Sequence, residues 1–219
     1  ATFNGPVADS PVPTIAIAGS GIANVTSTNM TKTSTTVYTY SYAVPTGDGT
    51  GTVTVGTAQD AAGNVVTSTP TSGATFTVDN TAPTISAVTQ VPTPSNDTTP
   101  SYVFTTNETG TVTTNIGAGI DSGGTVSSTG ENTETFNTLD AGTYADKTIT
   151  LEDAAGNTSS LTLVTFVIDT TAPTAAITYN SVSPYKNGDT VTITATFNGP
   201  VADSPVPTIA IAGSGIANV

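Results

Sequence analysis

The chain has 219 residues, of which 3 are Lys or Arg and 16 are Asp or Glu, so its formal net charge is −13. It contains no His and no Cys. Because Lys and Arg neutralise phosphate groups, this charge argues against nucleic acid as a partner, and the missing His and Cys remove the usual nucleophile–base pairs. No apolar run reaches the length of a membrane-spanning helix. We therefore predict a protein that is not an enzyme and that does not insert directly into a membrane.

Short segments of alternating apolar and polar residues follow one another along the chain. They cover residues 35–42, 51–55, 148–151, 162–168 and 190–197. In the last of these, Val191, Ile193 and Phe197 share one face and threonines occupy the other. Such period-two alternation indicates strands, and the Gly, Pro, Asn and Asp clusters between them indicate turns. No stretch has helical periodicity, so the sequence predicts an all-β fold of sandwich type.

Two motifs recur at a spacing that suits a domain. Asp60-Ala-Ala-Gly-Asn64 returns as Asp153-Ala-Ala-Gly-Asn157, and Asp79-Asn-Thr-Ala-Pro-Thr84 returns as Asp169-Thr-Thr-Ala-Pro-Thr174. A β-sandwich of immunoglobulin type takes about 100 residues. The spacing therefore predicts sandwich modules that follow one another along the chain. Short linkers join them, and Pro83 and Pro173 stiffen these linkers.

The first 25 residues of the chain are repeated, letter for letter, as residues 195–219. We expect this identity because the chain covers one full period of a longer repetitive protein and the start of the next. The predicted boundaries are then module A at 1–83, lacking its first strands, a complete module B at 84–173, and the N-terminal part of the next module A at 174–219. The alternative is that separate subunits donate residues 174–194 to one another and so polymerise.

The two D-A-A-G-N loops and the junctions V-D-N-T-A-P and I-D-T-T-A-P resemble those of bacterial immunoglobulin-like tandem repeats in large surface adhesins and other extracellular proteins. The resemblance extends over essentially the whole chain. It implies immunoglobulin-like sandwiches arranged end to end, an extracellular or cell-surface location, and Ca²⁺ bound at the junctions between modules.

Acidic residues are expected to gather where modules meet. The predicted sets are Asp60, Asp79 and Asp97 at one junction, and Asp153, Asp169 and Asp189 at the other. Ca²⁺ takes six to eight oxygen ligands, and carboxylates that lie close together repel one another unless a cation lies between them. The other interpretation of each D-A-A-G-N motif is a tight turn, in which Gly takes positive φ and the Asp and Asn side chains bond to the turn backbone.

The sequence thus predicts a structural role, as a spacer or stalk in a bacterial cell-surface adhesin or extracellular fibre. Its partners would be neighbouring repeats of the same chain or identical subunits, and no ligand at the tip is indicated. A second interpretation is a repeat that binds carbohydrate or protein, for which the absence of Trp is unfavourable.

Overall fold

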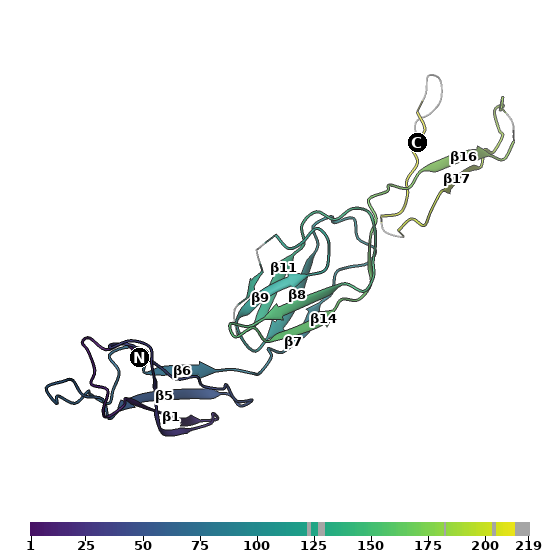
Figure 1. The fold of residues 1–219 in the computed structure, drawn as a ribbon. Helices are drawn as coiled ribbons and strands as arrows, with labels where there is room; N and C mark the ends of the chain where they lie inside the picture. The colour runs from purple at the N-terminus through teal and green to yellow at the C-terminus, as the bar shows by residue number, and fades with distance from the viewer. Residues whose placement is uncertain (122–123, 127–129, 182, 203–204, 213–219) are drawn as a thin grey trace. The chain divides into compact units, whose positions relative to one another are not determined.

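The computed structural model describes residues 1–121, 124–126, 130–181, 183–202 and 205–212 (Figure 1). All regular secondary structure in these ranges is β-strand, which confirms the predicted all-β fold. The chain divides into two compact units, Ala1–Ile168 and Asp169–Val219. No helix in the described residues is long and apolar enough to cross a membrane.

The N-terminal part of the first unit, residues 1–78, is built on one four-stranded antiparallel sheet. Its strands, in the order β2-β1-β5-β6, are β2 (Val25–Asn29), β1 (Thr14–Ser20), β5 (Gly49–Gly56) and β6 (Thr75–Val78). A short pair, β3 (Thr31–Lys32) and β4 (Tyr38–Thr39), adjoins it in sequence. The predicted strand at 35–42 is therefore shorter than expected. The buried apolar side chains of this part are few: Pro13, Ile17, Met30, Tyr38, Val55, Ala58 and Val78.

Residues 85–168 form a β-sandwich. One sheet has the order β10-β9-β13-β14, with β10 (Thr125–Val126), β9 (Gly110–Thr114), β13 (Thr148–Glu152) and β14 (Thr158–Thr162). The other has the order β11-β8-β7, with β11 (Glu131–Thr135), β8 (Ser101–Thr106) and β7 (Ile85–Thr89). A further pair joins β12 (Gly142–Tyr144) to β15 (Phe166–Ile168).

Side chains from both sheets form the core of the sandwich. Strand β13 shows the pattern that builds it, since Ile149 and Leu151 have no exposed surface while the threonines between and before them are half-buried. The aromatic side chains of Tyr102 and Phe104 enter the same cluster from β8. Alternation with period two therefore places one apolar face of each sheet against the other.

The second unit contains one hairpin, β16 (Ala175–Tyr179) paired with β17 (Ile193–Phe197). None of its described residues is buried, and Ile177 and Tyr179 expose 46% and 58% of their surface. A two-stranded hairpin alone is marginally stable in water. This unit therefore lacks a hydrophobic core of its own within the residues that the structure describes.

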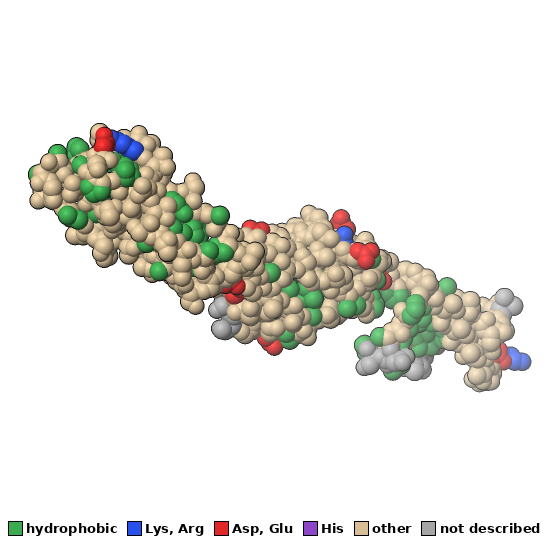
Figure 2. Space-filling model, turned by 60° about the horizontal axis from the view of Figure 1, so that its bottom comes forward, with side chains coloured by type: hydrophobic (Ala, Val, Ile, Leu, Met, Phe, Trp, Pro, Cys, Tyr) green, Lys and Arg blue, Asp and Glu red, His purple; other side chains and the backbone are tan. Residues whose placement is uncertain are grey.

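The surface of the molecule is mainly uncharged. On the face shown in Figure 2, uncharged polar side chains and backbone dominate, with scattered acidic side chains. The ion pair between Lys32 and Asp9 is the only one within the described ranges. Threonine at the outward strand positions supplies the polarity that charged residues give to most proteins.

Candidate metal centre

The two D-A-A-G-N loops have the same local structure. In the first, Asp60 Oδ1 accepts hydrogen bonds from the backbone N–H of Ala62 and of Asn64, both at 2.9 Å. The Asn64 side-chain amide donates to Asp60 Oδ2 at 2.7 Å. Gly63 has a φ of 86°, which the turn requires and which glycine adopts without strain.

In the second loop Asp153 Oδ1 accepts from the N–H of Ala155 and of Asn157 at 2.8 and 2.9 Å, and the Asn157 amide donates to Oδ2 at 2.9 Å. The side-chain amide of the loop's Asn, followed by backbone N–H groups, lowers the pKa of both Asp60 and Asp153 below the ordinary value. Both aspartates are therefore held ionised as part of the turn, as the tight-turn interpretation expects.

The second loop also contacts the linker that precedes the sandwich. The Asn157 amide donates to the backbone carbonyl of Asp79 at 3.1 Å, and Ser159 Oγ donates to the carbonyl of Pro83 at 2.5 Å. The N–H of Thr84 donates to Asn107 Oδ1 at 2.6 Å. Loops at one end of the sandwich thus fix the linker along most of its length.

The N-terminal part holds the same linker through Asp48. This carboxylate accepts from the N–H of Asn80 at 2.5 Å and from the hydroxyl of Thr81. Those two bonds, the hydroxyl first, lower its pKa. The Asn80 amide donates in turn to the carbonyls of Pro45 and Gly47 at 3.2 and 2.9 Å. Residues 79–84 are consequently bonded on both sides, which restricts rotation about the linker.

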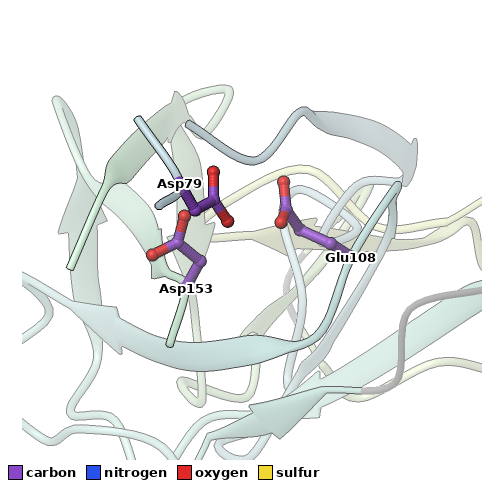
Figure 3. Close-up of side chains that lie close together, drawn as sticks. All are labelled: Asp79, Glu108 and Asp153. Atoms are coloured by element: carbon purple, nitrogen blue, oxygen red, sulfur yellow. The ribbon is translucent and has the colours of Figure 1, made fainter. Parts of the chain in front are cut away.

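Three carboxylates gather at this junction. Asp79, Glu108 and Asp153 each offer one oxygen, and these oxygens lie within 4.8 Å of one another (Figure 3). Asp79 directly follows β6, Glu108 lies in the turn between β8 and β9, and Asp153 directly follows β13. Asp153 is buried, Glu108 is half-buried and Asp79 is exposed. This group is the only one of its kind among the described residues.

The donor set is that of a hard cation. The chain has no His or Cys, and the three carboxylates together supply six oxygens, so N/S-ligated zinc is disfavoured against Ca²⁺ or Mg²⁺. One oxygen from each of the three chain segments gives three ligands, which is fewer than the six to eight oxygens that Ca²⁺ takes. The residues present therefore suit a hard divalent cation, for which water or backbone carbonyls would have to complete the shell.

The grouping differs from the one predicted from sequence. Asp79 and Asp153 were assigned to different junctions, yet they lie together, and Glu108 was not among the predicted ligands. The physical reason is the position of the D-A-A-G-N loop. It connects two strands of the sandwich at the end where the chain enters, so it meets the preceding linker.

The other four predicted ligands take part in local turns. Their backbone partners are Ala62 and Asn64 for Asp60, Thr99 for Asp97, Thr171 for Asp169 and Lys186 for Asp189. None of the four belongs to a group of three or more carboxylates in the described part of the chain. No sequence signal marked Glu108, because it lies in the short turn between β8 and β9 and the sequence does not show that this turn reaches the same end of the sandwich as the Asp153 loop.

A comparison with protein-family models finds no match to this chain, and a comparison with curated proteins finds none.

Proposed function

We propose that this protein is a structural spacer made of immunoglobulin-like modules in tandem, part of an extracellular or cell-surface adhesin or fibre of a bacterium, and that it catalyses no reaction. The observation that carries the proposal is the linker at 79–84. Hydrogen bonds hold it from both sides, whereas a chain whose modules act independently needs only a flexible connection. A restrained linker transmits orientation from one module to the next, which is what a stalk requires.

Calcium completes this proposal. Asp79 belongs to the linker, while Glu108 and Asp153 belong to the sandwich. An ion bound by all three carboxylates therefore fixes the linker to the sandwich. It also removes the repulsion among three close carboxylates. Ca²⁺ therefore stiffens the junction and stabilises the folded chain by mass action.

A carbohydrate-binding face would need exposed aromatic rings, but Tyr38, Tyr42 and Tyr144 pack against other aromatic residues. Tyr144 stacks on Phe166 with ring centroids 5.0 Å apart, and Tyr42 meets Phe76 edge-on at 5.5 Å. Tyr38 is 1% exposed. These contacts favour the spacer over a binding module, whose aromatic rings would be displayed to solvent.

Small-angle X-ray scattering of the whole chain tests the proposal. With Ca²⁺ we expect a longer maximum dimension and a less flexible particle than with chelator present. The matched control is Glu108→Gln, for which the scattering should be the same in both conditions. Identical profiles of the unaltered chain with Ca²⁺ and with chelator would contradict a calcium-stiffened spacer.

A further inference from the structure

One tripeptide occurs twice in the described chain and pairs through a different edge each time. Residues 1–3 and 195–197 are both Ala-Thr-Phe. In the first copy the N–H of Phe3 donates to the carbonyl of Thr36 at 2.8 Å, and the N–H of Tyr38 donates to the carbonyl of Ala1 at 3.0 Å. In the second copy the same tripeptide forms the end of β17 and pairs with β16.

The two pairings use opposite sides of the strand. Asn198, which follows the second copy as Asn4 follows the first, donates its N–H to the carbonyl of Thr174 at 3.0 Å. Consecutive residues of an antiparallel strand direct their backbone groups alternately to the two sides. Phe3 and Asn4 are consecutive, so the edge that binds Thr174 in the second copy is the edge left open in the first.

The sandwich shows the finished arrangement. There β8 lies between β11 and β7, with both of its edges paired. Hairpins β7–β8 and β16–β17 match in register as well, since Ile85 lies opposite Thr106 and Ala175 opposite Phe197. In both hairpins the residue after the linker proline donates its N–H to the asparagine that follows the second strand, at 2.6 and 2.9 Å. The counterpart of β7 for residues 1–83 is therefore β16.

An open groove lies where that counterpart belongs. It runs between residues 3–7 on one side and residues 58–60 and 64–66 on the other, and Val65 on its wall is 71% exposed. In the sandwich, the equivalent position lies beside the start of β14, where Ser159 binds the carbonyl of Pro83. Figure 1 shows β7 and β14 side by side there.

Burial of the two linker prolines supports the same conclusion. Pro83 is fully buried against the sandwich that follows it. Pro173, at the same place in the second linker, is exposed, and so is every residue of β16. The apolar strand β16 is thus exposed, and the groove beside residues 3–7 is open.

We infer that this groove binds residues 169–194 of a second copy of this sequence, whose β16 pairs with the open edge of residues 1–4. The inference deepens the proposed function. It rests on that proposal in one respect only, namely that copies of the sequence follow one another in tandem. The occupant is an apolar strand segment that completes the sheet as β7 completes its own, with Thr174 and Ala176 opposite Asn4 and Thr2, as they are opposite Asn198 and Thr196 in the hairpin. At the completed junction, Asp60 and Asp169 stand where Asp153 and Asp79 stand in the other, while Gly5 replaces Glu108.

Hydrogen exchange on an extended chain tests this inference. Residues 169–194 are joined ahead of Ala1, and amide exchange is measured in chelator, so that calcium plays no part. We expect the amides of Thr2 and Asn4 to exchange roughly tenfold more slowly or better in the extended chain, because each gains a backbone hydrogen bond. The amide of Phe3, already bonded to Thr36, serves as the internal reference.

The matched control carries Ile177→Asp within the added segment alone. It should restore the fast exchange of Thr2 and Asn4, since a carboxylate then takes the place of an apolar strand residue. Unchanged exchange of Thr2 and Asn4 in the extended chain, or equal protection by the Ile177→Asp segment, would overturn the inference. Either result leaves the calcium-dependent scattering unaffected, so failure of the groove and failure of the spacer are distinguishable.

Discussion

Replacing Glu108 with Gln should change stability in opposite directions with and without calcium. The variant keeps the shape of the half-buried side chain but removes one of three carboxylates that lie within 4.8 Å of one another. In chelator it relieves like-charge repulsion, so the melting temperature should rise. In Ca²⁺ it removes a ligand, so the variant should lose most of the stabilisation that the ion gives to the unaltered chain.

The size of the calcium effect follows from linkage. At a free Ca²⁺ concentration of 100 times Kd, binding adds about 2.7 kcal/mol to the free energy of unfolding. The compact unit that contains the site spans Ala1–Ile168, and in a unit of that size 1 kcal/mol moves Tm by roughly 2–4 °C. The unaltered chain should therefore melt roughly 5–11 °C higher in Ca²⁺ than in chelator.

Differential scanning calorimetry of both chains, with Ca²⁺ and with chelator, measures the effect. Asp60→Asn is the matched control, because Asp60 has the same loop hydrogen bonds as Asp153 but lies outside the carboxylate group. It should lower Tm equally in both conditions. The reasoning fails if Glu108→Gln lowers Tm in chelator, or if it melts like the unaltered chain in Ca²⁺.

Three further outcomes are expected. Leu151→Ala, at a side chain with no exposed surface, should lower the free energy of unfolding in urea by about 2–5 kcal/mol, whereas Val164→Ala, 60% exposed, should leave it nearly unchanged; equal effects would contradict the described core. The folded-state pKa of Asp60 is depressed, so its contribution to stability is present above the ordinary Asp range and is lost as pH falls through the folded pKa. Asp60→Asn should therefore lose less Tm than the unaltered chain between about pH 5 and pH 2. If Tm falls by the same amount in both chains over this range, the explanation is wrong. Gly110→Ala puts a methyl group 2.5 Å from a backbone carbonyl of β13 and should cost about 1–3 kcal/mol in the same urea titration, whereas Gly142→Ala meets nothing within 4 Å and should cost less.

The strands were predictable from sequence wherever one face is buried. At 148–151 the alternation places Ile149 and Leu151 in the core, as expected. At 162–168 the predicted strand is interrupted: the side chain of Leu163 is buried at 4% exposure, that of Val164 is 60% exposed, and the chain is irregular until Phe166. The sequence does not reveal such a break, since Leu163 and Val164 are adjacent and both suit a buried strand.

The turn chemistry of the D-A-A-G-N loops was also predictable, because Asp60 and Asp153 bond to residues within four positions in the sequence. The grouping of the carboxylates was not. It depends on which end of a sandwich each loop occupies, and Asp79, Glu108 and Asp153 come from three separate places in the chain. Sequence spacing shows that a loop exists but not the end to which the strand before it runs.

The most direct test of the account is the distance between the two parts that the linker joins. The chain has no Cys, so spin labels at Val12→Cys and Val164→Cys, both exposed valines of the first unit, report on the linker alone. Pulsed electron paramagnetic resonance should give one narrow distance distribution in Ca²⁺ and a broader one in chelator, and Glu108→Gln in Ca²⁺ should match the chelator result. A broad distribution that calcium leaves unchanged would contradict the claim that this junction is a calcium-stiffened spacer.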